Sequence, residues 1–403
     1  MALGLLAASL WGCTSSGGDG AAQTSTPEEV EGPPLRGAGF DQSRVTIGVV
    51  ADLTGPDAVR QGRLVDGVEA YWADAASRGG VDGRYPVQVT VLDTAGDPEA
   101  ALRLAGEHAG EVVLFGLVGA QDGVEAVRPV LVEDGVTAVV VNPLRSVYDE
   151  VTGMGAGLPL PARADALATW LAEAGEAGRW CMGDPAAAGL ADALAGLAPG
   201  LGSTVAAPLP PVADGEQSLS EVATEAGCQV VWLDGSAEGR RALLDLAVSN
   251  HGGRVALVAD DPELPAEVAA WAPERLVVAT AAPPWDEPEP EIQAMVAAVQ
   301  AHSPDLAPSD GVALGWASQQ IVDRLLSDAV AAGSLAREEV ALLAAALADP
   351  PSVAGSWSGV GGQRSAVGTV TVWAPGAPTE GGSVRTILAR VPVAARRTPP
   401  TTG

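Results

Sequence analysis

Lysine is absent from this 403-residue sequence, so arginine supplies all 22 basic side chains against 51 acidic ones. The formal net charge is -29 at pH 7. Nucleic-acid binding needs clustered cations that displace counterions from phosphates, so this balance argues against a nucleic-acid partner. It also argues against attraction to an anionic membrane surface. We expect a solvated acidic exterior instead.

Histidine and aromatic residues are also scarce. The 3 histidines lie far apart in the sequence, so neither a histidine-based catalytic triad nor a histidine zinc site is expected. We expect no metal and no cofactor. Only 4% of residues are aromatic while 47% are apolar, so the cores must consist of small aliphatic side chains. A chain of this length suits two domains of comparable size.

The N-terminus opens with a short apolar stretch, far below the about 20 apolar residues that span a bilayer. Leu10, Gly12 and Cys13 resemble the lipobox of bacterial lipoproteins, in which cleavage before the cysteine exposes a thiol for acylation. We therefore expect a signal peptide at 1–12 and lipidation of Cys13. The aperiodic Ser, Gly, Pro, Thr and Glu residues of 13–43 are typical of a disordered tether. The alternative is a chance apolar N-terminus with a buried cysteine.

Two further cysteines belong to the globular part of the chain. Cys181 lies late in one expected strand, and Cys228 lies just before the next. Exported proteins often pair such cysteines. Neighbouring parallel strands with this offset, however, would hold the two Cα atoms beyond disulfide reach. We expect two buried thiols, and the paired alternative stays open.

From residue 44 onward, short β-branched runs alternate with amphipathic helical segments. The first run, Val45 to Val50, ends in the turn 52–56 and leads into a helix that is expected to end at Ser77. Such alternation requires a parallel sheet with right-handed crossovers. The alternation restarts near residue 158, and strands separated by glycine turns are expected over 356–393. The sequence therefore predicts an α/β protein with two doubly wound parallel-sheet lobes.

The carboxyl ends of the predicted strands are the expected place for a ligand, because open α/β sheets bind ligands there. In the turn that follows the first strand, Thr54 and Gly55 are predicted to face the ligand. Thr54 is also well suited to a purely structural turn.

The order and spacing of five stretches of the sequence are characteristic of a known family. They read IGVVADLTGP, AASRGGVDGR, DTAGDPEAALRLA, VVLFGLVGAQDGVEAVRPVLVEDGVTAVVVNP and ALGWASQQIVDRLLSDAVAAGSLAREEVALLAAAL. Their order and spacing resemble those of the solute-binding proteins of ABC importers, in the branch that includes the leucine/isoleucine/valine binders. The resemblance covers nearly everything from Val45 to Val393.

This resemblance implies the type I periplasmic-binding fold, in which two lobes are joined by a multi-strand hinge. Lobe 1 is expected to comprise 44–157 plus 284–348, and lobe 2 is expected to comprise 158–283 plus 349–395, with a tail at 396–403. The implied function is extracytoplasmic binding of a small polar solute, such as an amino acid, an amide or a short peptide. The implied partners are an ABC permease and ATPase complex, with membrane attachment through the lipid anchor only.

In the amino-acid-binding members of this family, hydroxyl and backbone N–H groups of lobe 1 hold the α-carboxylate of the ligand. Ala120 stands where the family has a serine, and Gln121 could donate in its place with a different reach. Leu144 and Ser146 match an alanine and a threonine that face the ligand. Ser146 suits a helix N-cap equally well. A branched-chain amino acid is therefore no longer the default ligand.

In lobe 2 the family uses an acid to hold the ammonium group of the ligand. Asp260 or Asp261 falls at the expected strand end, and Asp234 ends another strand. Acids at such places also form ordinary turns. Trp316 is a candidate aromatic wall of the site, although a large aromatic side chain also suits core packing.

Two alternatives come from other functional classes. A tethered ligand sensor or interaction module would have the same fold and no transport role. An Asp-dependent phosphotransferase is suggested by Asp52-Leu53-Thr54-Gly55 after the first strand, but that chemistry needs magnesium-binding acids and a cation, and the chain has no lysine. No nucleophile elbow and no glycine-rich dinucleotide motif follows the first strand. We therefore expect a binding protein and no enzyme.

Overall fold

A computed structural model describes residues 35–119, 121–141, 154–184, 188–210, 217–259, 264, 266–282, 285, 288–306, 309–347, 352–358, 365–379 and 382–393. The strands of these residues are β1 (Val45–Ala51), β2 (Val87–Asp93), β3 (Phe115–Val118), β4 (Ala138–Val140), β5 (Met154–Ala156), β6 (Arg179–Met182), β7 (Thr204–Val205), β8 (Val230–Asp234), β9 (Arg254–Val258), β10 (Leu276–Thr280), β11 (Ser356–Ser358), β12 (Ser365–Thr379) and β13 (Gly382–Val393). The α-helices are α1 (Ala58–Ser77), α2 (Pro98–His108), α3 (Gln121–Glu133), α5 (Leu160–Glu173), α6 (Ala188–Leu197), α7 (Leu219–Glu225), α8 (Ala237–Val248), α9 (Ala266–Trp271), α10 (Pro290–His302), α11 (Asp310–Ala332) and α12 (Arg337–Ala346). In the described part of the chain, no helix combines the length and apolarity needed to cross a membrane.

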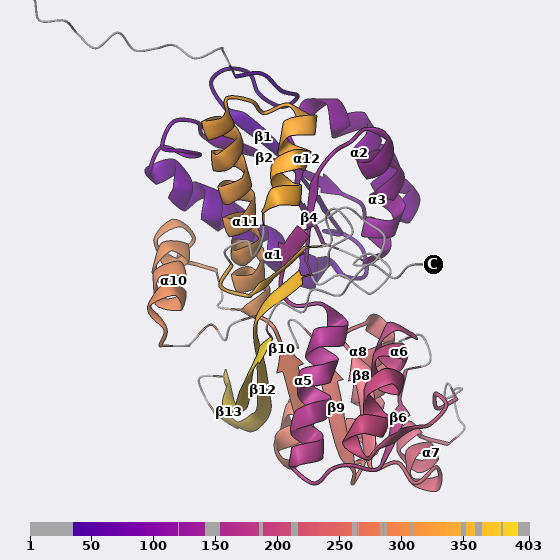
Figure 1. Ribbon diagram of the computed structural model, residues 1–403. Coiled ribbons are helices and arrows are strands. Elements are labelled where there is room, and N and C mark those ends of the chain that lie inside the picture. Colours follow the sequence, from indigo (N-terminus) through magenta and orange to yellow (C-terminus); the bar gives the residue numbers. More distant parts are fainter. Residues whose placement is uncertain are drawn as a thin grey trace, which may run out of the picture. The chain divides into compact units, whose positions relative to one another are not determined.

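The strands form one hydrogen-bonded path in the order β2-β1-β3-β4-β5-β11-β12-β10-β9-β8-β6-β7, with β13 paired to β12. Strands β1 to β5 pair in parallel, and strands β6 to β10 do the same. The two parallel segments are connected by antiparallel pairs, because β11 joins β5 to β12 and β12 joins β10. Figure 1 shows both segments with their helices. The predicted mostly parallel α/β fold is confirmed.

The first parallel segment, β2 to β5, has a hydrophobic core on each face. Along β1 the side chains alternate between the two cores, as the pleat requires: Val45, Ile47 and Val49 belong to one, and Val50 belongs to the other. Helices α1 and α11 cover the first face, and α2 and α3 cover the second. A strand that is buried on both faces explains why its sequence reads as a continuous apolar run.

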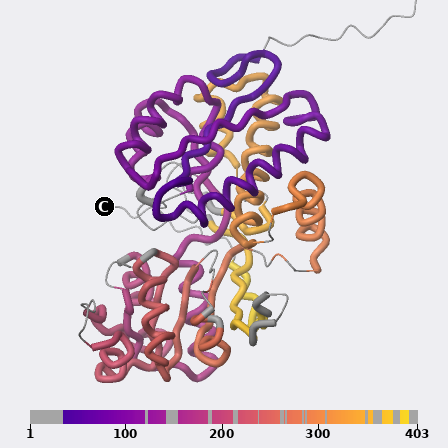
Figure 2. The backbone as a smooth tube through the Cα atoms, turned by 180° about the vertical axis from the view of Figure 1, so that it is seen from behind, coloured from indigo at the N-terminus to yellow at the C-terminus, as the bar shows by residue number. Residues whose placement is uncertain are grey.

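Helices α1 and α11 pack unusually closely. A Cβ atom on Gly67 would collide with the carbonyl oxygen of Val312, and one on Gly315 would collide with that of Leu64. At this crossing Trp72 donates a 2.9 Å hydrogen bond from Nε1 to Gln319 Oε1, and Gln319 Nε2 donates to the Gly116 carbonyl at 3.0 Å. Figure 2 shows orange α11 running beside indigo α1, although the two helices are far apart in the sequence.

The second parallel segment, β10 to β7, is built in the same way. On β8 the side chains of Val230 and Trp232 face one core, and those of Val231 and Leu233 face the other. Helices α5 and α6 cover the first face, and α7, α8 and α9 cover the second. Strand β12 contributes Val370 and Val372 to this part of the molecule, but its first residues pair with β11.

A disulfide bond joins Cys181 and Cys228, with the two Cα atoms 5.7 Å apart. The expectation of two free thiols is therefore wrong. It assumed that Cys228 continues the line of β8, in which Cys181 pairs with Val231. Instead Cys228 lies in the turn that leaves α7, where its N–H donates to the Ala223 carbonyl at 3.0 Å. The turn brings the sulfur atom of Cys228 beside that of Cys181.

The tether prediction is wrong for residues 35–43, because this stretch packs against the first core. Leu35 and Phe40 contact that core, and the Phe40 ring meets the Tyr85 ring edge-on at 5.3 Å. The Thr46 N–H donates to the Gly39 carbonyl at 2.7 Å. Two apolar side chains and backbone hydrogen bonds thus attach this stretch to the first core. The predicted signal peptide, Cys13 and the earlier part of the tether lie outside the described residues.

Candidate functional site

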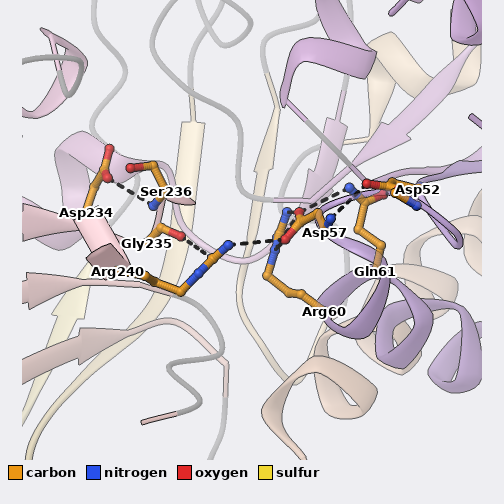
Figure 3. A network of polar contacts seen from close by, with 9 residues as sticks. Asp52, Asp57, Arg60, Gln61, Asp234, Gly235, Ser236 and Arg240 are labelled. Carbon is orange, nitrogen blue, oxygen red and sulfur yellow. Dashed lines mark hydrogen bonds and ion pairs between the residues drawn. The ribbon is translucent and has the colours of Figure 1, made fainter. Parts of the chain in front are cut away.

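The carboxyl ends of β1 and β2 carry a turn whose polar groups bond to one another. Asp52 is only 2% exposed, and its carboxylate accepts the N–H groups of Gly55 at 2.6 Å and Asp57 at 2.9 Å. The N–H of Asp52 donates to Gln61 Oε1 at 2.8 Å. We call residues 52–57 together with Asp93 the β1 edge, of which Figure 3 shows Asp52 and Asp57. Its shape is fixed by its own hydrogen bonds.

Asp93 ends β2 and holds the middle of this turn. Its carboxylate accepts the N–H groups of Leu53 and Ala95, both at 2.9 Å, and the Thr54 hydroxyl at 2.9 Å. These hydrogen bonds, led by that of the Leu53 N–H, hold the pKa of Asp93 below its usual range. Two of the predicted ligand contacts therefore have internal partners, since Thr54 donates to Asp93 and the Gly55 N–H donates to Asp52.

Asp57 is the acceptor for side chains from two distant parts of the chain. Arg60 Nε lies 2.9 Å and Gln61 Nε2 lies 3.2 Å from Asp57 Oδ2, both from the first turns of α1. Arg240 of α8 reaches Asp57 Oδ1 through Nη2 at 3.5 Å, as Figure 3 shows. Burial alone would raise the pKa of Asp57, but the hydrogen bond and charge of Arg60 outweigh it and lower that pKa.

A second polar edge lies at the carboxyl ends of β6 and β8. It consists of Asp184, which follows β6, and of residues 234–240 at the end of β8, and we call it the β8 edge. Asp234 Oδ1 accepts the N–H of Ser236 at 3.0 Å, and the Ser236 hydroxyl donates to Asp184 Oδ2 at 3.0 Å. Ser236 also caps α8 by accepting the Gly239 N–H at 2.9 Å. One serine thus connects both acids with the start of a helix.

Burial raises the pKa of Asp234, and the negative charge of the nearby Asp184 acts in the same direction. The hydrogen bond from Ser236 and the charge of Arg163 only partly offset this effect. Asp184 is 2% exposed and Arg163 is 3% exposed, so these charges interact with little screening by water. An acid in such a place is stabilised by an additional positive charge or N–H donor.

The other predicted site residues lie either in the first core or outside the described part of the structure. Trp316 is 6% exposed and meets the Tyr71 ring edge-on at 5.0 Å inside the first core. Gln121 begins α3, and its side chain is outside the described part of the structure. Ala120, Leu144, Ser146, Asp260 and Asp261 also lie outside it. Ligand contact by any of the predicted residues stays a prediction.

Sequence reasoning did not select Asp57, Arg240, Ser236 or Asp184 as site residues. Asp184 and Ser236 could have been predicted from the sequence, because each comes within two residues of the end of a strand. Asp57 and Arg240 could not have been predicted, since they meet across 183 positions of sequence. Within the described residues, no group of three or more histidine, cysteine or acidic side chains could hold a metal ion.

Residues 44–365 match the family model of the periplasmic binding proteins, and the chain belongs to this family. No curated protein matches it. Among solved structures it is similar to a fatty acid ABC transporter substrate-binding protein from Thermomonospora curvata, with a TM-score of 0.71 at 18% identity over 90% of this chain and 95% of that one. A leucine-binding protein from Thermotoga maritima has a TM-score of 0.69 at 18% identity over 86% and 98% of the two chains.

A solute-binding protein of an ABC transporter from Rhodopseudomonas palustris, in complex with 3,4-dihydroxybenzoic acid, is also similar. Its TM-score is 0.67 at 16% identity, over 88% of this chain and 97% of that chain. Identities this low show the shared fold alone. The family therefore makes this chain a periplasmic binding protein, and the ligand has to be argued from its own residues.

Proposed function

We propose that this protein binds a small polar solute outside the cytoplasm and delivers it to an ABC permease and ATPase complex. The observation that supports the solute site best is the like-charged pair of buried Asp184 and partly buried Asp234 at the β8 edge, which the Ser236 hydroxyl and N–H connect. Strand ends are where α/β proteins hold ligands. Membership in the periplasmic binding protein family agrees with a binding role and no catalysis.

The chemistry of the two edges favours a solute that offers N–H groups. An ammonium or amide group would stabilise ionised Asp234, whose pKa burial raises. At the β1 edge, by contrast, the Thr54 hydroxyl and the Gly55 N–H already donate to carboxylates of the protein. An incoming carboxylate would have to compete for those donors. Amides, amines and short peptides are therefore proposed ahead of free branched-chain amino acids.

The similar structures illustrate how widely ligands vary on this fold. Their descriptions name a fatty acid transporter, a leucine-binding protein and a complex with 3,4-dihydroxybenzoic acid. The fold alone therefore does not determine which solute binds. Specificity depends on the side chains that line the site, which is why we base the proposal on Asp234 and its neighbours.

The arrangement of Asp52 argues against the phosphotransferase alternative. A nucleophilic aspartate needs an exposed carboxylate oxygen beside a metal ion. Asp52 is 2% exposed, and both of its carboxylate oxygens accept backbone N–H groups.

The solute proposal is tested by adding amides, amines, short peptides and amino acids to the purified chain. A solute that binds only the folded state raises the melting temperature, so thermal unfolding is followed together with tryptophan fluorescence. The Asp234→Asn variant is expected to weaken binding on the order of 30-fold or more, because it removes one partner of a buried charge contact. Asp192→Asn, at an exposed site on α6, is the matched control. An unmoved melting temperature across the whole panel would count against the proposal.

Anchoring through Cys13 and the division into two lobes are part of the same proposal. The proposed lobes comprise 44–157 plus 284–348 and 158–283 plus 349–395. A Cys13→Ser variant is expected to leave the membrane fraction of its host cells. Unchanged fractionation would argue against the anchor.

A further inference from the structure

A partly exposed ion pair connects the β1 edge and the β8 edge. Arg240 Nη2 lies 3.5 Å from Asp57 Oδ1, and the two side chains are 39% and 23% exposed. Figure 3 shows the two edges facing each other, with Arg240 reaching across. The pair therefore joins the two strand ends at which we place the solute.

Both partners are held in position by their own edges. The Arg240 guanidinium donates from Nη1 to the Gly235 carbonyl at 2.6 Å. The Asp57 N–H donates to Asp52 at 2.9 Å, and its carboxylate is held by Arg60 and Gln61. Because both groups are already oriented, little side-chain entropy is lost when they meet.

The same anchors make the contact easy to break. When Arg240 leaves, Asp57 keeps two hydrogen-bonding partners, and Arg240 keeps the Gly235 carbonyl. Neither charge is left buried and unpaired, which is the usual large cost of separating an ion pair. Partial exposure weakens the attraction further, because water and salt screen it. The pair can thus form and open reversibly.

We propose that the Asp57–Arg240 pair holds the β1 edge and the β8 edge together while no solute is bound, and thereby controls access to the site. This inference rests on the proposed function in so far as the two edges carry the solute site. A solute that contacts both edges lies near this pair, because the pair joins them. The strength of the pair then sets the fraction of molecules that are open to solute.

The test uses the full chain without solute and follows the distance between dyes at positions 132 and 248. Val132 in α3 and Val248 in α8 are 65% and 70% exposed, so azide-bearing residues for dye attachment disturb no core there. The Arg240→Glu variant places two negative charges together, and its dye distances are expected to shift to larger values. Arg240→Lys keeps the charge and is expected to shift them less.

Arg241→Glu is the matched control, because it makes the same charge change at an exposed neighbouring position of the same helix. It is expected to leave the dye distances of the native chain unchanged. Salt at about 1 M, where the Debye length is about 3 Å, is expected to shift the native chain as Arg240→Glu does. In Arg240→Glu, which has no attraction left to screen, the same salt is expected to cause no further increase in dye distance.

Equal dye distances in Arg240→Glu and Arg241→Glu would overturn the inference, whatever the solute panel shows. If Arg240→Glu opens the chain but no solute binds, the pair does hold the two edges together, and the proposed function fails. If solutes bind and the distances do not change, the function stands and the access control fails. Equal melting temperatures of both variants are expected, so a shift confined to Arg240→Glu cannot be ascribed to unfolding.

Discussion

The β1 edge and the β8 edge are both acidic turns at the ends of parallel strands, yet their acids have opposite electrostatic settings. At the β1 edge, Asp52 and Asp93 accept backbone N–H groups, and the pKa of Asp93 is lowered. At the β8 edge, burial and Asp184 raise the pKa of Asp234. The first set of acids stabilises the fold, whereas Asp234 is held at a cost to it.

This difference separates a structural role from a binding role. An acid with a full set of donors has nothing further to gain from a ligand. An acid that is desolvated beside another acid gains from any cation or N–H donor that arrives. Strained or costly groups concentrate at functional sites because the surrounding fold supports them.

The largest effect is expected from removing the disulfide, which ties the turn before β8 to β6 and so supports Asp184 and Asp234. Replacing both Cys181 and Cys228 by serine is expected to lower the free energy of unfolding by about 2–5 kcal/mol, chiefly because the unfolded chain regains entropy. Urea unfolding measures this loss. Cys13→Ser is the control and is expected to have no effect. An unchanged urea midpoint after reduction of the native chain would contradict the prediction.

The next largest effect is expected at the β1 edge, from Asp52→Ala. This change leaves the N–H groups of Gly55 and Asp57 without their acceptor, at a cost of about 2–3 kcal/mol. Thermal or urea unfolding provides the measurement. Asp52→Asn keeps one acceptor oxygen and is expected to lose less. Equal stability of Asp52→Ala and the native chain would show that the turn does not depend on this carboxylate.

An Asp→Asn substitution is expected to change stability by a smaller amount, and in opposite directions at the two edges. Asp93→Asn is expected to reduce stability by less than about 1 kcal/mol, because the contact is exposed. Asp234→Asn is expected to keep or raise stability at pH 7, within about 0.5 kcal/mol, because it removes a charge that burial disfavours. If Asp234→Asn proved the more damaging of the two variants, the comparison would fail.

The smallest effect is expected in the pH dependence. Because the folded state raises the pKa of Asp234, it binds the proton more tightly than the unfolded chain does. Stability from this group is therefore present below the unfolded value of about 3.9 and is lost as pH rises through the folded pKa. Any stability gain of Asp234→Asn over the native chain should thus vanish as pH falls toward about 4. Unfolding curves measured between pH 4 and 7 decide this, and a gain that grows on acidification would refute it.

The sequence alone predicted the alternation of most strands and helices, because their periodicity is a local property, but it missed the short elements β5, β7, α7 and α9. It also placed polar turns at the strand ends. It did not predict the disulfide, since the position of Cys228 depends on how the chain leaves α7. For a similar reason the sequence did not decide whether Trp316 lines the site or packs in the core, because its burial depends on how α11 packs against Tyr71 of α1. Helix α7 was missed because it has only 7 residues, although Ser218 and Glu221 form a capping box at its start.

The two edges could not be told apart from the sequence either. Asp52 directly follows β1 and Asp234 is the last residue of β8, and a turn with a glycine follows each of them. Their difference comes from neighbours that are distant in sequence, such as Asp184 and Arg163 around Asp234. The Asp57–Arg240 contact joins residues 183 positions apart, and no local sequence pattern predicts it.

The close packing of α1 against α11 has a consequence for biosynthesis. Trp72 bonds to Gln319 across 247 positions, and Tyr71 bonds to Asp323 across 252 positions. At a synthesis rate of about 5–20 residues per second, the apolar face of α1 is made roughly 12–50 s before its partner helix. Contacts this distant also slow folding itself. The face of α1 that packs against α11 therefore has no partner until residues 310–332, close to the C-terminus, have been synthesised.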